Sequence, residues 1–334
     1  MTFLSDKALE KLRSAGELPD FRGTRYANLQ FLARGGMGAV YAADDQTLER
    51  RVAIKILDAL DPDGSPARPL SNEARVLAQL EHPGVVPVHD SGVLSDGRAF
   101  YVMKFVQGAR LDQFLAGVAE IPERLRLFLR VSEAVSFAHS HGVLHRDLKP
   151  SNIMVGSFGE VLVMDWGVAK ILRPSSTPSS KPSAHPQPPT ATQLPASTAA
   201  YTEDGIVVGT PGFMSPEQAE GRSSALDARS DIYSLGKLLE YVVLREPANQ
   251  KTRVPKPLRA ISARAAAADP NDRYASVSDL ADDVRRFLDG RAVSAYSENP
   301  WERTKRFYLR NQAAILLITT YLLVRTLFQL YGRH

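Results

Sequence analysis

The chain contains no cysteine among its 334 residues. This absence excludes disulfide bonds and thiolate metal sites, and it is compatible with a reducing cytosol. Residues 1–7 lack a charged segment followed by a sustained apolar run, so no cleavable signal peptide is predicted. With 44% hydrophobic residues the chain can bury a large core, and its length favours one or two domains.

Charge is unevenly distributed along the chain. The formal net charge is +4, but residues 291–334 carry seven Lys or Arg against two Asp or Glu, which is +5 and leaves the remainder near −1. The basic character therefore belongs to the C-terminal segment. This distribution argues against a nucleic-acid-binding body and favours an anionic partner, such as a lipid surface, near the C-terminus.

The C-terminal segment contains one long apolar run. In the 19 residues 313–331, Arg325 is the only charge, and this length suffices to span a bilayer core as a helix. The juxtamembrane segment 291–310 contains five basic residues, and four of them stand just before the run, namely Arg303, Lys305, Arg306 and Arg310. By the positive-inside tendency they hold the preceding body in the cytoplasm, so we predict a single-pass membrane protein.

A buried or interfacial helix is the alternative for this segment. An arginine at the centre of a spanning helix costs about 2.5–3.5 kcal/mol on insertion scales. Arg325 lies late in the run, where its side chain can reach the interface, and the Leu/Ile-rich stretch before it outweighs the cost. We therefore expect a membrane helix over residues 311–331.

The periodicity of apolar residues predicts a small β-rich part followed by a larger α-rich part. Residues 1–25 form an extension that the pattern does not assign. Strands are predicted over residues 26–33, 39–44, 51–57 and 100–103. Helices are predicted over residues 69–80, 111–115, 122–141, 231–244 and 278–288.

Residues 173–200 interrupt this pattern. They contain seven prolines and many Ser and Thr but few large apolar residues. Such a composition cannot bury enough surface to offset the entropy of an ordered chain. We predict a disordered insert.

Four motifs follow one another in an order that chance rarely produces. They are Gly35-Gly36-Met37-Gly38, Val52-Ala53-Ile54-Lys55, His145-Arg146-Asp147-Leu148-Lys149-Pro150-Ser151-Asn152 and Asp165-Trp166-Gly167. Glycines let backbone amides approach phosphate oxygens, a lysine on a strand can bind them, and the last two motifs supply two carboxylates, an ammonium and an amide. These are the groups that phosphoryl transfer needs to position a polyanion, metal ions and a hydroxyl.

On these motifs the chain resembles a protein kinase, specifically a bacterial member of the eukaryotic-like (Hanks-type) Ser/Thr class. The resemblance covers roughly residues 26–290 and neither end of the chain. It implies an α+β, two-lobed fold with an N-lobe over residues 26–106 and a C-lobe over residues 107–290. It also implies that residues 173–200 lie in the activation segment.

The resemblance implies an ATP site. Lys55 would contact the α- and β-phosphates and be held by Glu73. Ala33 stands where the family's first loop glycine is expected, a departure that tightens the loop and weakens nucleotide affinity. The full implied set of ATP-binding residues is Leu32, Ala33, Gly35, Gly36, Gly38, Val40, Ala53, Lys55, Glu73, Met103 and Phe105.

For the transfer itself, the resemblance makes Asp147 the general base that accepts the proton of the incoming hydroxyl. Lys149, two residues later, would neutralise the transferring phosphoryl group, a spacing typical of Ser/Thr kinases. Asn152 and Asp165 would ligate Mg²⁺, or Mn²⁺ as an alternative, because hard oxygen ligands suit a hard cation. Trp166 replaces the usual Phe but remains a large apolar residue, able to pack against His145.

Structural or regulatory roles follow for six further residues, His145, Arg146, Thr210, Glu217, Asp231 and Arg273. Glu217 would form a buried ion pair with Arg273, and Asp231 would brace the catalytic loop. For the insert we keep two interpretations, a passive spacer and a phosphorylated segment. In the second, its hydroxyls, or Thr202 and Thr210 beside it, accept phosphate and pair with Arg146.

The leading hypothesis is a membrane-tethered, non-specific Ser/Thr protein kinase whose substrates are proteins, including itself. A nucleotide-binding pseudokinase is the main alternative, and a small-molecule phosphotransferase ranks last. The chain between Gly236 and Arg273 is shorter than the family usually has, which leaves substrate docking open. Dimerisation is also left open, and no nucleic-acid partner is expected.

Overall fold

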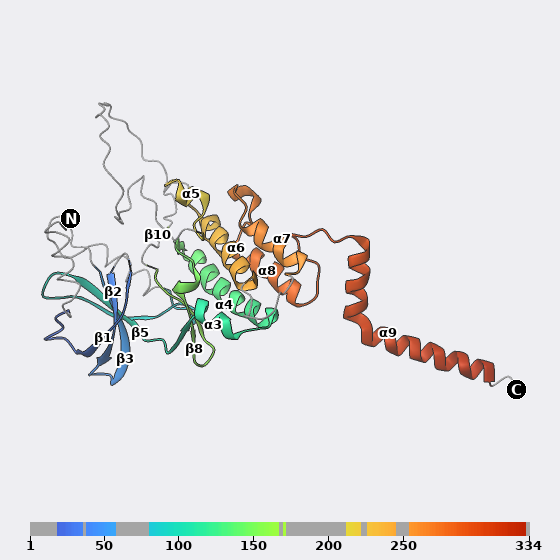
Figure 1. The fold of residues 1–334 in the computed structure, drawn as a ribbon, viewed down its shortest axis with the longest axis horizontal. Coiled ribbons are helices and arrows are strands. Elements are labelled where there is room, and N and C mark those ends of the chain that lie inside the picture. Colours follow the sequence, from blue (N-terminus) through green and yellow to red (C-terminus); the bar gives the residue numbers. More distant parts are fainter. Residues whose placement is uncertain are drawn as a thin grey trace, which may run out of the picture.

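The computed structural model describes residues 19–35, 38–57, 80–166, 170–171, 212–221, 226–244 and 254–331. Within these ranges a small lobe built on a sheet is followed by a larger helical lobe and by a long helix that extends away from it (Figure 1). The N-terminal extension up to residue 18, the predicted insert at 173–200 and residues 69–79 of the helix predicted over residues 69–80 lie outside the described residues.

The N-lobe contains a five-stranded antiparallel sheet with strand order β1-β2-β3-β5-β4. Its strands are β1 (Tyr26–Gly35), β2 (Gly38–Asp45), β3 (Arg50–Leu57), β4 (Val88–Val93) and β5 (Ala99–Lys104). Four of the five confirm the strands predicted from the sequence. The fourth strand in chain order, β4, was not predicted.

Alternation along β3 and β5 gives the sheet two apolar faces. Ile54 and Ile56 pack with Phe21, Tyr26 and Phe100 in a core on one face, where the aromatic rings meet edge to face. On the other face, Ala53 and Met103 join the large core that continues into the helical lobe. Lys55 has the same parity as Ala53, so the strand period directs this lysine toward the boundary between the lobes.

The C-lobe is built around α4, which packs on α6 and α8, while α7 packs on α6. The C-lobe also contains two small sheets, whose strand orders are β6-β8-β9 and β10-β7. The helices and strands are β6 (Gly108–Arg110), α3 (Leu111–Phe114), η1 (Leu115–Gly117), α4 (Ile121–Ser140), β7 (Val143–Leu144), η2 (Pro150–Asn152), β8 (Ile153–Gly156), β9 (Val161–Val163), β10 (Lys170–Ile171), α5 (Pro216–Ala219), α6 (Ala228–Leu244), α7 (Lys256–Ala265), η4 (Pro270–Asp272) and α8 (Val277–Leu288).

The apolar face predicted for residues 122–141 is the buried face of α4. Leu125, Phe128, Val131 and Val135 on it are fully buried. Arg124 is buried as well, because its guanidinium donates hydrogen bonds to the carbonyl oxygens of three residues, Leu115, Val118 and Val242. Arg124 lies on the same helical face as Phe128 and Val131, and its hydrogen bonds tie α4 to the end of α6.

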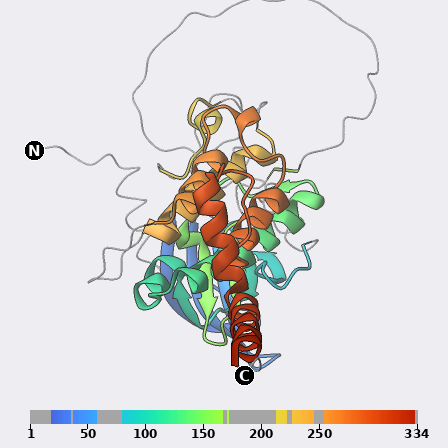
Figure 2. The same cartoon turned by 90° about the vertical axis from the view of Figure 1, so that its right-hand side faces the viewer.

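The last element, α9 (Pro300–Tyr331), is interrupted at Asn311, whose φ of −112° and ψ of 17° are not helical. Figures 1 and 2 show the chain changing direction within this helix and leaving the C-lobe. Residues Asn311–Gln329 have a mean hydropathy of 1.3 and form, within the described residues, the one helix long and apolar enough to cross a membrane. None of it is buried in the structure, which contradicts the buried alternative and leaves the interfacial one open.

Candidate active site

The loop after β7 is held by one buried carboxylate. Asp231, in the first turn of α6, accepts hydrogen bonds from the backbone N–H groups of His145 and Arg146, both at 2.8 Å. Its Oδ2 also lies 2.8 Å from Nε2 of His139 on α4. Burial acts to raise the pKa of Asp231, but the His139 hydrogen bond keeps it below the ordinary value. The bracing expected of Asp231 is thus present, and it fixes Arg146 in a left-handed conformation with φ of 69°.

The two predicted catalytic side chains and one predicted metal ligand meet just after this brace. Nζ of Lys149 donates to Oδ2 of Asp147 at 2.6 Å. Nδ2 of Asn152 donates to the same oxygen at 3.1 Å and to the carbonyl oxygen of Asp147 at 2.8 Å. The carboxylate of Asp147 is therefore oriented by an ammonium and an amide, which is how a base aimed at an incoming hydroxyl must be held.

Lys55 reaches across from β3 to a second carboxylate. Its ammonium forms a short ion pair with Oδ1 of Asp165, and it lies 5.8 Å from the ring centroid of Tyr101. Asp165 follows β9 with a φ of 60°, the left-handed conformation of a tight turn. Burial acts to raise the pKa of Asp165, but the charge of Lys55 and its hydrogen bond hold that pKa below the ordinary value. The group therefore stays anionic.

The two halves of the site share one electrostatic environment. The charge of Lys149 also acts on Asp165, in the direction that lowers its pKa. Lys55 from the N-lobe, Asp165 from the turn after β9 and Lys149 from the catalytic loop are consequently close in space. Residues 110 positions apart in the chain converge, as the motif order predicts.

His145 and Trp166 pack against each other in the interior next to these charged side chains. Nδ1 of His145 accepts from the backbone N–H of Asp147 at 3.2 Å, and its Nε2 lies 3.0 Å from the carbonyl oxygen of Met164 and donates to it. The two rings are 4.6 Å apart, as predicted, and Trp166 is fully buried. Burial lowers the pKa of His145, so the imidazole is neutral and acts as a structural bridge.

Most of the residues implied to bind ATP belong to strands β1, β2, β3 and β5 of the N-lobe sheet. Val40 pairs with Lys55, and Ala53 pairs with Met103. Ala33 also pairs with Val40 across the turn that Gly35 and Gly38 close. Phe105, after β5, packs against the main core, and Leu32 is exposed. Gly36 and Glu73 lie outside the described residues.

Gly38 has a steric reason to be glycine besides any contact with phosphate. Its φ is 149°, and a Cβ at this position would lie 1.9 Å from the carbonyl oxygen of Ile56. The start of β2 therefore approaches β3 more closely than any side chain allows.

The predicted metal ligands offer suitable atoms. Nδ2 of Asn152 is engaged by Asp147, which leaves the amide oxygen at the other end of the group as its donor to a cation. The carboxylate of Asp165 supplies a second hard oxygen. No cluster of three or more His, Asp or Glu side chains occurs in the described residues. Two protein oxygens are consistent with Mg²⁺, which keeps water and phosphate oxygens as its other ligands.

Beyond the catalytic loop, the predicted pair of Glu217 and Arg273 is present. Nη1 of Arg273 lies 2.7 Å from Oε1 of Glu217, and Nη2 lies 2.9 Å from Oε2, with both side chains buried. Ser230 donates to the same carboxylate at 2.9 Å. Burial acts to raise the pKa of Glu217, but these hydrogen bonds lower it to about 2. Thr210 lies outside the described residues.

Two polar residues of the site were not predicted. His139 contacts Asp231, and Gln218 donates from Nε2 to the carbonyl oxygen of Arg146 at 2.8 Å. Gln218 also closes a capping box with Ser215. The Ser-x-x-Gln spacing of that box is visible in the sequence and marks the start of α5, although it gives no hint of the contact with Arg146.

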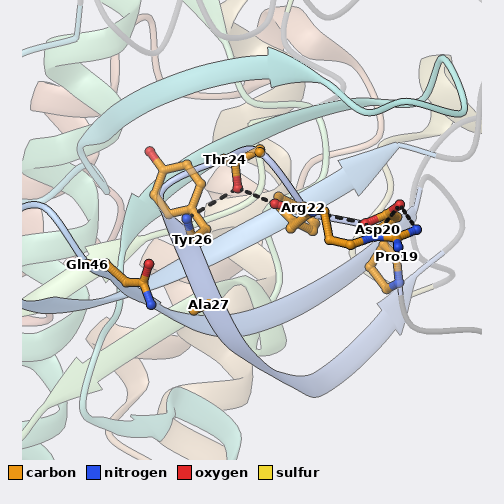
Figure 3. A pocket seen from close by; sticks show the side chains of 9 residues that line it. Pro19, Asp20, Arg22, Thr24, Tyr26, Ala27 and Gln46 are labelled. Atoms are coloured by element: carbon orange, nitrogen blue, oxygen red, sulfur yellow. Dashed lines mark hydrogen bonds and ion pairs between the residues drawn. The ribbon is translucent and has the colours of Figure 1, made fainter.

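A cavity of about 530 Å³ lies elsewhere, at the beginning of the N-lobe. Figure 3 shows its lining, with Asp20 paired to Arg22 and with Thr24, Tyr26 and Gln46 around it. None of the predicted catalytic, ATP-binding or metal-binding residues lines it. It is open to solvent and plays no part in the site described above.

The sequence profile of the protein kinase domain matches residues 26–298, so the chain belongs to the protein kinase family. It is 31% identical to a serine/threonine-protein kinase PknD of Protochlamydia amoebophila over 88% of this chain and 34% of that protein. It is 35% identical to the probable serine/threonine-protein kinase SCO3848 of Streptomyces coelicolor over 84% of this chain and 42% of that protein. The resemblance to bacterial Ser/Thr kinases is confirmed.

The fold has the same support from solved structures. The kinase domain of Mycobacterium tuberculosis PknI is 24% identical and superposes with a TM-score of 0.55, covering 80% of this chain and 98% of that domain. The two-lobed kinase fold predicted from the motifs is therefore confirmed. The chain spans about a third to two fifths of the length of the curated relatives it matches.

Proposed function

We propose that the chain is an ATP-dependent Ser/Thr protein kinase that transfers the γ-phosphoryl group to protein hydroxyls, including its own. The observation that carries this proposal is the arrangement of Asp147 between Lys149 and Asn152, beside the pair of Lys55 and Asp165. A carboxylate base, a phosphate-neutralising ammonium and hard oxygen ligands are thereby collected at one place.

Each side chain has a defined task in this proposal. Lys55 holds the α- and β-phosphates, and Asp147 orients the acceptor hydroxyl and takes its proton as the oxygen attacks phosphorus. Lys149 offsets negative charge on the transferring group. Asn152 and Asp165 hold Mg²⁺, which, when bound with ATP, neutralises charge on the β- and γ-phosphate oxygens.

The test is incubation of the purified full-length chain with γ-labelled ATP and Mg²⁺. We expect label on Ser and Thr of the chain and of an added protein substrate. The Asp147→Asn variant should label at least about 10²-fold more slowly, because a positioned base contributes 10²- to 10⁴-fold. Nucleotide binding should persist in this variant, since the ion pair of Lys55 with Asp165 is unchanged.

The outcomes separate this proposal from its rivals. Equal label in the Asp147→Asn variant means a contaminating kinase and removes the proposal. ATP binding without label in either protein favours the pseudokinase. Label that appears only on a small-molecule acceptor favours the phosphotransferase on the same fold.

Regulation by phosphorylation of the segment near Thr202 and Thr210 is a further part of the proposal. Support comes from Arg146, which is buried and whose Nε has no hydrogen-bond partner among the described residues. Burial lowers the pKa of this guanidinium, so an anionic partner beside it would be stabilising. Mass spectrometry of active protein should find phosphate on this segment, and its absence there would remove this part of the proposal.

Membrane anchoring through Asn311–Gln329, with the kinase domain in the cytoplasm, completes the proposal. Because the chain lacks cysteine, single introduced cysteines report topology without a background. A membrane-impermeant thiol reagent added to intact cells should label Gly332→Cys and spare Asp282→Cys on the exposed surface of α8. If both introduced cysteines are labelled equally, and only after lysis, the helix does not span the membrane.

A further inference from the structure

The segment that joins the C-lobe to the apolar helix is itself a separate helix with its own beginning. Oδ1 of Asn299 accepts from the backbone N–H of Glu302 at 2.8 Å, and Oε2 of Glu302 accepts from the backbone N–H of Asn299 at 3.2 Å. Pro300 occupies the first turn, where a missing N–H costs nothing. The helix then runs to the break at Asn311.

One face of this short helix is held by polar contacts, to Tyr296 and Glu298 in the connecting segment and to Lys256 on α7 of the C-lobe. Arg306 forms a two-fold hydrogen-bonded ion pair with Glu298, at 2.8 and 2.9 Å. Glu302 accepts from the hydroxyl of Tyr296 at 3.0 Å and from Lys256 at 3.3 Å. In residues 301–309 only Glu302 and Arg306 are partly covered. A groove of about 850 Å³ separates the helix from Pro255 and Leu288.

The other face carries three exposed aromatic side chains. Trp301, Phe307 and Tyr308 are 76%, 61% and 52% exposed. At 100° per residue, each lies about 100° or more around the helix from Glu302 and Arg306. Exposed Lys305 shares the face of Trp301 and Tyr308, with spacings of four and three residues. The helix therefore turns an aromatic and basic surface away from the lobe on which it docks.

We propose that residues 300–310 form an interfacial helix, whose aromatic face lies in the headgroup layer of a bilayer containing anionic phospholipid. This inference rests on the proposed membrane anchor. Continuity with the apolar helix Asn311–Gln329 places the face at the membrane edge, and Trp and Tyr favour that depth because one end of each ring is apolar and the other polar. The basic side chains match anionic headgroups. The break at Asn311 lets one helix lie along the surface while the next crosses it.

The docked face gives this arrangement a consequence for the kinase. Because Glu302 contacts Lys256 on α7 and Tyr296, which packs against the main core, insertion of the helix holds the lobe against the membrane surface. A free linker would let the lobe rotate away. The protein hydroxyls presented to the site are then those of acceptors close to the same bilayer.

Trp301 itself provides the test, because the chain has two tryptophans and Trp166 is fully buried in the core. The full-length chain is reconstituted into phosphatidylcholine vesicles containing phosphatidylserine, with lipids brominated either near the headgroup or near the chain ends. The fluorescence difference between wild type and Trp301→Phe isolates Trp301. We expect a blue-shifted emission that headgroup-proximal bromine quenches at least twofold more than bromine at the chain ends.

Charge is tested with a matched pair of variants. Removing one lysine near an anionic surface weakens insertion roughly fivefold. Lys305→Gln should therefore lower the equilibrium constant for Trp301 insertion by about that factor, while Lys237→Gln on α6 leaves it unchanged. The preference for phosphatidylserine vesicles over pure phosphatidylcholine should shrink only in Lys305→Gln.

Flotation of the vesicles separates the failures. Protein that floats with the vesicles while Trp301 emits as in water and escapes both quenchers overturns the interfacial helix and leaves the anchor standing. Protein that does not float overturns both. Quenching by chain-end bromine alone places Trp301 in the bilayer core and also overturns the inference.

Discussion

At the scale of single residues, the catalytic loop owes its shape to one side chain. Asp231 satisfies two consecutive backbone N–H groups with two different oxygens. A residue with one acceptor oxygen cannot do this. The shape of the loop that carries Asp147 therefore depends on the side chain of Asp231 in α6.

The Asp231→Asn variant tests this dependence. One of the two amides must lose its acceptor, which costs about 1–3 kcal/mol for a buried group. We expect lower stability in urea unfolding and a larger loss in kcat than in ATP affinity, because Lys55 is untouched. The exposed Asp282→Asn variant should match wild type. An unchanged kcat in Asp231→Asn would contradict the brace.

The ionisation of Glu217 makes the free energy of unfolding depend on pH in the acid range. Its pKa falls from 4.5 to about 2 on folding, so the stabilisation is complete above pH 4.5 and is lost as pH falls toward 2. Urea unfolding between these pH values should show this loss in wild type and less of it in Glu217→Gln. At neutral pH, Glu217→Ala should cost about 3–5 kcal/mol, because Arg273 remains buried and uncompensated.

The pair of Lys237 and Glu240, whose side chains are 32% and 42% exposed, supplies the control, since pairs near the surface contribute about 0–1 kcal/mol. Glu240→Gln should leave the acid dependence intact. A Glu217→Gln variant with the wild-type acid profile would show that another carboxylate is responsible.

Residue-scale prediction from the sequence succeeds where the groups are neighbours in the chain. Asp147, Lys149 and Asn152 lie within six positions, so local backbone geometry suffices to bring them together. The roles of His139 and Gln218 were not predicted, because they depend on contacts with Asp231 and Arg146 that form only in the folded lobe. Nothing in their local pattern distinguishes them from ordinary polar residues.

At the scale of elements, periodicity predicted the strands and helices that bury a regular apolar face. It missed β4, whose residues include His89, Ser91 and Gly92 and whose side chains are only half-buried along one face. This strand exists because β5 offers it an edge to pair with. Pairing partners are tertiary information that a single strand does not contain.

The contact between α6 and α7 gives the element-scale prediction. A Cβ on Gly236 would lie 2.7 Å from the backbone nitrogen of Ala266 and 2.8 Å from Cβ of Ala265. Helix propensity favours Ala over Gly by about 1 kcal/mol, but overpacking against backbone costs about 1–3 kcal/mol. Gly236→Ala should therefore be destabilising in urea unfolding, against the propensity trend.

Gly117 is the matched control for this substitution. An added Cβ there meets no atom within 4 Å, so Gly117→Ala should change stability by about 0.5 kcal/mol or less. If Gly236→Ala is more stable than wild type, α7 can shift away and the two helices are not tightly packed.

At the scale of the whole molecule, the chain joins a kinase body to an apolar C-terminal helix that the body does not bury. Hydropathy alone predicted the apolar segment, because a run of this length without paired charges has few other uses. The break at Asn311 and the contact of Glu302 with Lys256 could not be predicted, since both depend on where the C-lobe ends in space.

Truncation after Arg310 separates these parts. No part of Asn311–Gln329 is buried against the kinase body, so the truncated kinase should unfold within about 2 °C of the full-length chain. Its KM for ATP in the labelling reaction should be unchanged. It should leave the membrane pellet, yet its retained interfacial helix should still bind phosphatidylserine vesicles weakly. Salt screens exposed charges over about 10 Å at 0.1 M, so this residual binding should disappear at 1 M salt. A large fall in unfolding temperature would mean that the apolar helix packs on the kinase body after all.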